Sequence, residues 1–154
     1  MFELKQALAG VRNTSPGKDE ICYKMVVNLT PQAQMGILQL FNRVWESGTL
    51  PLAWKHSVVI PIGKPGKDKS EMTSYRPIAL TSNMCKVMER MVTDRLTYIV
   101  ESRSMISPSQ SGFRRGRTTM DPVLCLENIV RKAQANKEMV DAILFDVEKA
   151  YDML

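Results

Sequence analysis

Residues 142–152, which read Ala-Ile-Leu-Phe-Asp-Val-Glu-Lys-Ala-Tyr-Asp, decide the fold predicted for the chain. The apolar, β-branched and aromatic run predicts a buried strand that ends at Asp146. Because side chains alternate along a strand, Val140 and Leu144 share a face with Asp146. A carboxylate at the end of such a face is costly to bury unless it is paired or holds a metal. The alternative reading of these residues alone is an aspartate that caps a helix after the strand.

Length and composition bound the class of protein. With 154 residues, 44% apolar and 24% charged, the chain has the size and composition of one globular domain. Its three cysteines are far apart, and the single His56 has no cysteine near it, which argues against a zinc site and favours reduced thiols. No stretch of eighteen apolar residues and no signal-peptide pattern occur. We therefore expect an intracellular protein, nuclear or cytoplasmic, without a membrane partner.

The positive charge is gathered in two places. The net charge is +5 and the pI about 9.2, which suggests a polyanionic partner. Lys64, Lys67, Lys69 and Arg76 form one cluster, and Arg114, Arg115 and Arg117 form the other. The alternative is that these cations are ordinary solvated surface.

Helices are predicted where apolar residues recur at helical spacing. For residues 31–46 the apolar spacing is supported by the residues at the helix start, because Thr30 is a suitable N-cap and Pro31 a suitable first helical residue. A second long helix should follow Thr81 as its cap. The predicted helical ranges are 2–11, 20–29, 31–46, 82–101 and 122–135.

Two short segments read as strands. Residues 57–62 and 75–80 each contain a proline, Pro61 and Pro77, and a basic loop joins them. Proline restricts a strand to an edge or a bulge, so a protruding hairpin is predicted rather than a core sheet. Residues 102–118 are rich in turn formers. No repeat, low-complexity segment or linker is found, and one domain is expected.

Three stretches in order resemble the reverse transcriptases of LINE-type (non-LTR) retrotransposons. They are residues 60–81, with Pro-Ile-Gly-Lys-Pro-Gly-Lys and Tyr-Arg-Pro-Ile-Ala-Leu-Thr; residues 112–118, Gly-Phe-Arg-Arg-Gly-Arg-Thr; and residues 145–152, Phe-Asp-Val-Glu-Lys-Ala-Tyr-Asp. The resemblance extends from about Ser15 to Leu154.

This resemblance implies an α+β fold. Residues 15–138 would be the mainly helical fingers region with its small hairpin, and residues 139–154 the first strand of the palm, truncated. The neighbours of that strand would come from sequence after Leu154. From the start at Met1 we expect no upstream domain. The family's function is RNA-templated DNA synthesis, with an RNA template, a DNA primer and dNTPs as partners.

The resemblance also assigns roles. Asp146 would bind two Mg²⁺ ions, which prefer hard oxygen ligands, together with the backbone carbonyl of Val147. Tyr151 would lie under the sugar of the incoming nucleotide and exclude a 2′-hydroxyl. We expect Lys64 and Arg76 to bind the triphosphate. Contacts to template or primer phosphates are expected from Lys86, Arg90, Arg114 and Arg117.

The chain departs from the family in one respect that bears on activity. The second catalytic motif of the family, an aromatic-x-Asp-Asp sequence, is absent, and no Asp-Asp pair occurs anywhere in the 154 residues. One carboxylate can contribute a ligand to both Mg²⁺ ions but cannot hold them without further carboxylates, so we expect no catalysis by this chain alone. The alternative function is that of a non-enzymatic nucleic-acid-binding remnant of a transposable element.

Overall fold

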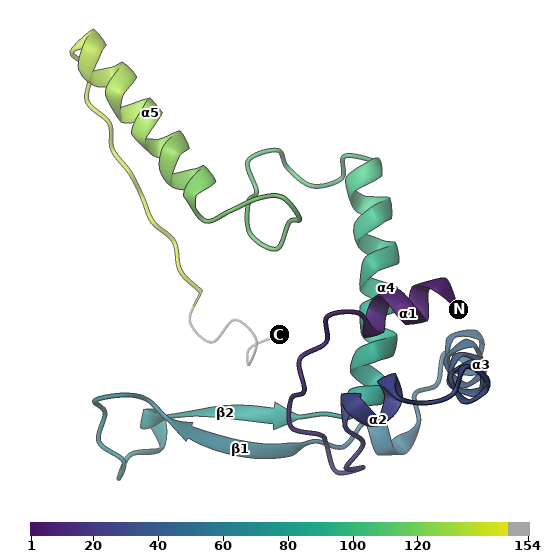
Figure 1. Cartoon of the computed structure of the whole chain (residues 1–154). Helices are drawn as coiled ribbons and strands as arrows, with labels where there is room; N and C mark the ends of the chain where they lie inside the picture. The colour runs from purple at the N-terminus through teal and green to yellow at the C-terminus, as the bar shows by residue number, and fades with distance from the viewer. Residues whose placement is uncertain (148–154) are drawn as a thin grey trace. The chain divides into compact units, whose positions relative to one another are not determined.

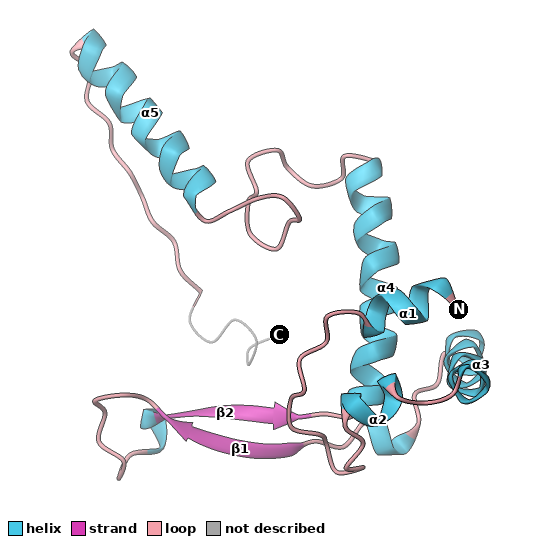
Figure 2. Ribbon diagram, viewed as in Figure 1, coloured by secondary structure: helices cyan, strands magenta, loops and turns pink. Residues whose placement is uncertain are grey.

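The computed structural model describes residues 1–147 and combines helices with one antiparallel hairpin (Figure 1, Figure 2). The elements are α1 (Phe2–Leu8), α2 (Tyr23–Val27), α3 (Pro31–Ser47), the 3-10 turn η1 (Leu52–Trp54), β1 (Val58–Gly63), the 3-10 turn η2 (Met72–Ser74), β2 (Tyr75–Leu80), α4 (Asn83–Ser102) and α5 (Met120–Asn136). The chain divides into two compact units, Met1–Arg103 and the residues from Ser104 onward. The expected mixture of helix and sheet is confirmed.

Helix α3 forms where its end signals predicted it. The Thr30 Oγ1 atom accepts a hydrogen bond from the Ala33 amide at 3.3 Å, and Pro31 begins the helix. Gly48 ends it in the left-handed conformation, with φ of 62°. Phe41 and Val44 are the buried residues of this helix.

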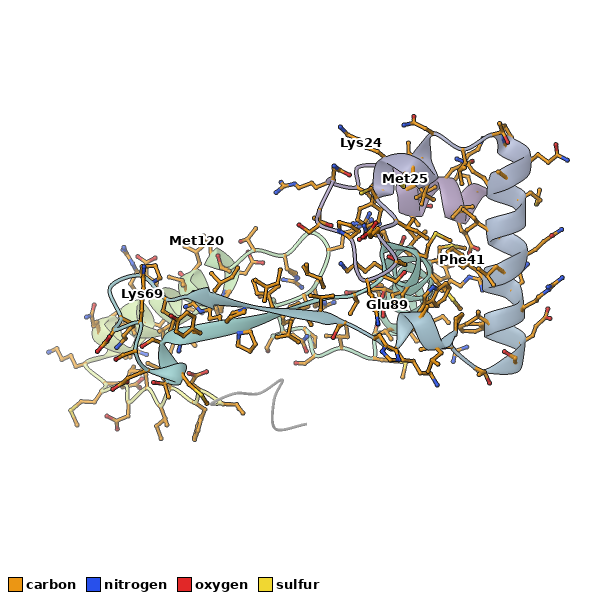
Figure 3. The ribbon with its side chains drawn as sticks, turned by 90° about the horizontal axis from the view of Figure 1, so that it is seen from below. Lys24, Met25, Phe41, Lys69, Glu89 and Met120 are labelled. Carbon is orange, nitrogen blue, oxygen red and sulfur yellow. The ribbon has the colours of Figure 1, made fainter. Side chains whose placement is uncertain are left out.

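The cluster of buried residues described below lies in the first unit. Helices α1 and α4 pack on one another, and the Phe41 ring on α3 meets the Trp54 ring edge to face, with centroids 5.9 Å apart. In Figure 3, Phe41 lies on the side of α3 that faces the other core elements. The buried cluster contains Leu4, Ala7, Leu8, Tyr23, Val26, Phe41, Val44, Trp54, Met84, Cys85, Val87 and Met91.

The hairpin is regular and exposed. Strands β1 and β2 pair antiparallel without a bulge, from Val58 opposite Leu80 to Gly63 opposite Tyr75. All six residues of β1 are exposed, which confirms a protruding hairpin rather than a core sheet.

The two prolines of the hairpin face each other in this register, Pro61 opposite Pro77. The Lys64 amide donates to the Ser74 carbonyl, so Lys64 and Ser74 form a hydrogen-bonded pair just beyond the end of the strands. Hydrogen-bonded and non-bonded pairs alternate along an antiparallel ladder, and the pair of Pro61 and Pro77 lies three pairs away. Pro61 and Pro77 therefore form a non-bonded pair, so their missing N–H groups cost the ladder nothing. In a non-bonded pair the backbone N–H groups point away from the partner strand, toward the outer edges of the hairpin. A proline there offers no N–H to a further strand and so discourages its addition.

Helix α4 begins one residue later than its predicted cap. The N-cap is Ser82 rather than Thr81, since the Ser82 Oγ accepts from the Met84 amide at 3.2 Å. Ser82 is almost fully buried, with 1% of its surface exposed. Its hydroxyl also donates to Asp19, so a contact from distant sequence selects between two adjacent hydroxyl residues.

The helix predicted for residues 20–29 is shorter than expected. Only Tyr23–Val27 is helical, because Glu20 has a φ of 56° and Cys22 is extended. This conformation turns the Ile21 carbonyl toward the Asn83 side-chain amide, which donates to it at 2.9 Å. A tertiary hydrogen bond thus takes the place of the predicted first helical turn.

The second unit contains α5 and the segment that follows it. The predicted strand is wrong for the part that the structure describes, because residues 138–147 adopt no regular secondary structure. Leu144 and Phe145, predicted to be buried, are 93% and 91% exposed. A strand is held by hydrogen bonds to a neighbouring strand, and the sheet found among residues 1–147 consists of β1 and β2 paired with each other. Across residues 1–147, no helix has both the length and the apolar character needed to span a membrane.

Candidate nucleic-acid and nucleotide interface

The hairpin register brings two of the predicted phosphate ligands to one face. Arg76 on β2 lies opposite Ile62, and Lys64 follows β1 two residues further along. Side chains of paired residues and of residues two apart point to the same face of an antiparallel pair. Lys64 and Arg76 are therefore diagonal neighbours on a face whose other residues, such as Ile60 and Ile78, are aliphatic.

The two cations differ in what they already contact. The Lys64 Nζ atom donates to the Thr73 carbonyl at 2.8 Å, which ties the end of the hairpin loop together. Arg76 is exposed, and its side chain makes no hydrogen bond or ion pair with another residue of the described range 1–147. Its guanidinium is thus the more available of the two for a phosphate.

The loop between the strands carries further charge. Lys69 lies at the loop end of the hairpin (Figure 3), where its carbonyl accepts from the Tyr75 hydroxyl at 2.9 Å. The Asp68 carboxylate accepts from the Ser70 amide at 2.9 Å, and this backbone hydrogen bond lowers the pKa of Asp68. The loop is therefore held in shape by its own hydrogen bonds and carries charges of both signs.

The two cations predicted on α4 make contacts within the protein. The Arg90 Nη1 atom donates to the Ala7 carbonyl at 2.9 Å, at the end of α1 where carbonyls lack helical partners. Lys86 is half-buried, with its Nζ atom 3.5 Å from the Asn83 Oδ1 atom. In this structure Arg90 joins two helices, a role that the sequence reading had not included.

The loop from Ser104 to Thr119 contains the other predicted cations. Arg114 Nη1 donates to the carbonyls of Ser107 and Gln110 at 2.9 and 3.3 Å. Arg117 is exposed, and its amide donates to the Arg114 carbonyl. Arg114 therefore organises the loop, whereas Arg117 presents its side chain on the surface.

The predicted metal ligands lie in the extended segment after α5. Asp146 and Val147 are both exposed and belong to no helix or strand. Within residues 1–147 there is no group of three or more His, Cys, Asp or Glu side chains that could hold a metal ion. Tyr151, together with Glu148, Lys149 and Asp152, lies outside the described residues.

Two features of the site region were missed by the sequence reading. One is the contact of Asp19 with Ser82, which no local pattern could signal across 63 residues. The other is Phe113, whose side chain is 98% exposed at a φ of 60°. Its position beside three arginines was visible in the sequence.

Comparison with known proteins gives consistent matches. The family model described as reverse transcriptase (RNA-dependent DNA polymerase) matches residues 62–154. The chain is 33% identical over 138 residues to a probable RNA-directed DNA polymerase from transposon BS of Drosophila melanogaster. It is 32% identical over 138 residues to the RNA-directed DNA polymerase from mobile element jockey of the same species. It is 24% identical over 150 residues to a Pol polyprotein from the type-1 retrotransposable element R2 of Popillia japonica.

These similarities cover most of this chain and little of each relative. The BS and jockey matches take in 90% of the chain but 15% of the relative in both cases. For the R2 polyprotein the two shares are 97% and 20%. The 154 residues thus correspond to a limited part of much longer proteins.

Proposed function

The chain belongs to the reverse transcriptase (RNA-dependent DNA polymerase) family, and we propose that it supplies nucleotide- and template-binding surface to an RNA-directed DNA polymerase of the non-LTR retrotransposon kind. In the complete enzyme, that surface would meet an RNA template, a DNA primer and an incoming dNTP. Residues 15–138 would act as the fingers and residues 139–154 as the start of the palm.

The observation that carries this proposal is the shared hairpin face of Lys64 and Arg76. Both residues lie within the part of the chain that matches the family model. A triphosphate needs cations, and a guanidinium can grip two phosphate oxygens at once. Arg76 is exposed on a regular strand, and a regular strand sets the direction of its side chain better than a loop does.

The chemistry proposed for the complete enzyme is the attack of a primer 3′-hydroxyl on the α-phosphorus of a dNTP. Asp146 and the Val147 carbonyl offer the oxygen donors that Mg²⁺ prefers. The described residues do not make up a two-ion centre by themselves, because residues 1–147 provide no cluster of metal-ligating side chains. Asp146 is therefore proposed as one ligand of a site that needs further carboxylates.

The nucleotide-binding part of the proposal can be tested by NMR titration of the chain with dTTP. We expect amide shift changes at Ile62, Lys64, Arg76 and Ile78, on one hairpin face. Arg76→Gln should remove most of these changes, whereas Arg43→Gln, an exposed arginine on α3, should leave them unchanged. Equal changes at exposed lysines throughout the chain, or a response unaffected by Arg76→Gln, would contradict the proposed role.

Catalysis is tested separately by primer extension with Mg²⁺ or Mn²⁺. We expect the 154-residue chain to incorporate no nucleotide, because it contains no Asp-Asp pair to accompany Asp146. An Asp146→Ala variant provides the background. Template-dependent incorporation above that background would show that the chain holds both ions without the second motif.

A further inference from the structure

Phe113 is presented to solvent in a way that packing does not explain. Its side chain is 98% exposed, whereas Phe41 in the core is 2% exposed. Its backbone has a φ of 60°, a left-handed conformation that residues other than glycine seldom adopt. A ring this exposed gains nothing from burial, and the left-handed backbone is unfavourable for a residue other than glycine.

Hydrogen bonds fix the backbone on both sides of Phe113. Before it, the Gln110 side-chain amide donates to the Gly112 carbonyl at 3.2 Å. After it, the Arg114 guanidinium folds back onto the carbonyls of Ser107 and Gln110. The loop is closed by its own contacts, and the aromatic ring projects from the closed loop.

The loop around Phe113 is positively charged as far as Asp121, whose carboxylate accepts hydrogen bonds from the Thr118 amide and hydroxyl. Residues 104–120 contain three arginines and no aspartate or glutamate. Arg115 and Arg117 are exposed, with Gly116 between them at a φ of 74°. The Phe113 ring and the guanidinium groups of Arg115 and Arg117 therefore belong to one run of five residues, 113–117, in the loop that joins α4 to α5 (Figure 1).

We propose that Phe113 stacks on a base of a single-stranded nucleic acid while Arg115 and Arg117 contact the adjoining phosphates. The proposal rests on the proposed nucleic-acid-binding function and adds to it the residue that contacts the base. Exposed aromatic rings beside basic side chains are the standard means of binding unpaired strands without sequence preference. A duplex offers this ring no free base face, so single strands should be preferred.

The stacking contact is tested by fluorescence anisotropy with a labelled oligo(dT) and an oligonucleotide of equal length that lacks bases. Phe113→Leu keeps an apolar side chain of similar size but removes the aromatic face. We expect it to weaken binding to oligo(dT) about 5- to 100-fold and to leave binding to the abasic strand unchanged. Phe113→Tyr should retain the wild-type affinity for oligo(dT). Equal affinities of Phe113→Leu and wild type for oligo(dT) would overturn the proposal.

The salt dependence distinguishes the ring from the arginines. For a single strand the slope of log K against log salt is about −0.7 per phosphate contact. The double substitution of Arg115 and Arg117 by Gln should therefore reduce the slope by about 1.4, whereas Phe113→Leu should leave it unchanged. Because Phe113 is almost fully exposed, the far-UV spectrum of Phe113→Leu should match that of the wild type.

The nucleic-acid-binding function of the chain and the stacking role of Phe113 can be distinguished by these measurements. If the chain binds neither oligo(dT) nor the abasic strand, the proposed nucleic-acid-binding function fails and the stacking role fails with it. If it binds both strands equally and Phe113→Leu changes neither, the binding function stands and the stacking role is wrong. A ring that serves to dock another protein instead would give this second result.

Discussion

The Ser82 hydroxyl donates a hydrogen bond of 2.6 Å to the Asp19 Oδ2 atom, and so joins the loop after α1 to the start of α4. The other Asp19 oxygen accepts from the Ile21 amide at 3.3 Å. Ser82 also caps α4, and it lies two residues after the end of β2. Its contact with Asp19 therefore holds the junction between the hairpin and the helix. The orientation of the surface that carries Arg76 depends on that junction.

Replacing Ser82 by alanine should destabilise the first unit. The change removes the cap of α4 and leaves the Asp19 carboxylate without its donor, a loss of about 1–3 kcal/mol. Both tryptophans, Trp45 and Trp54, belong to the first unit, so urea unfolding followed by tryptophan fluorescence measures its stability. Thr81→Ala, at the cap position predicted from sequence, is the matched control and should change stability by less than about 0.5 kcal/mol. Equal losses in the two variants would contradict the role given to Ser82.

Gly17 and Gly36 should respond to alanine with opposite signs. A Cβ atom on Gly17 would come within 2.8 Å of the Ser82 nitrogen and the Thr81 carbonyl carbon, which are backbone atoms that cannot move aside alone. Gly17→Ala should therefore cost about 1–3 kcal/mol. A Cβ atom on Gly36, inside α3, would meet nothing within 4 Å, and Gly36→Ala should stabilise by about 0.5–1 kcal/mol. The same urea experiment measures both, and a stabilising Gly17→Ala would show that the loop does not pack on the junction.

The Cys85 thiol should resist alkylation in the folded protein. Burial first and the neighbouring Glu89 carboxylate second raise its pKa from 9.0 to about 11, and the thiolate is the reactive form. At pH 8, mass spectrometry after iodoacetamide treatment should find the exposed Cys125 modified and Cys85 unmodified. In urea above the unfolding midpoint all three cysteines should react. Rapid alkylation of Cys85 under native conditions would show that the core between α1 and α4 opens readily.

The same thiol gives a pH dependence. Because the folded state holds the Cys85 proton more tightly than the unfolded state, stability should fall as the pH rises from 9 toward 11. Cys85→Ala should remove this part of the decline. A decline of the same size in both proteins would assign it to other groups.

The sequence predicted those elements whose signals are local. Thr30, Pro31 and Gly48 specify the ends of α3, and Pro61 and Pro77 predict an exposed hairpin. Each of these signals acts through the residue's own backbone or its near neighbours. The helices and the hairpin were therefore accessible from sequence, and the family resemblance was confirmed by the match to residues 62–154.

The sequence did not predict features that depend on distant residues. The contact of the Arg90 guanidinium with the Ala7 carbonyl on another helix is one of these features, and the expected contact of Arg90 with nucleic acid stays a prediction. Ser82 prevails over Thr81 as the cap because Asp19 holds its hydroxyl. The residues around Asp146 have a strand-forming composition, but a strand also needs a neighbour, which composition does not reveal. The roles proposed for Arg76, Asp146 and Tyr151 remain predictions.

The exposed apolar residues before Asp146 lead to the last prediction. Ile143, Leu144 and Phe145 are 78%, 93% and 91% exposed in an extended segment that pairs with neither β1 nor β2. An unpaired β-prone apolar segment is a site for association between chains. Analytical ultracentrifugation of the chain should therefore show self-association that increases with concentration, and Phe145→Lys should reduce it. Phe113→Lys removes an equally exposed phenylalanine outside this segment and should leave the association unchanged.

Hydrogen exchange measures whether the backbone amides of this segment are hydrogen-bonded in the monomer. At concentrations below the association range, amides from Val140 to Val147 should exchange without protection, while those of α3 and α4 are protected. Protection of residues 140–147 should then appear as the concentration rises, because association supplies the missing strand partner. Strong protection in a monodisperse monomer would instead mean that the segment finds its partner within the chain. In that case the chain would form the start of the palm without help from other sequence, and the exposed segment would have to be reinterpreted as part of a closed sheet.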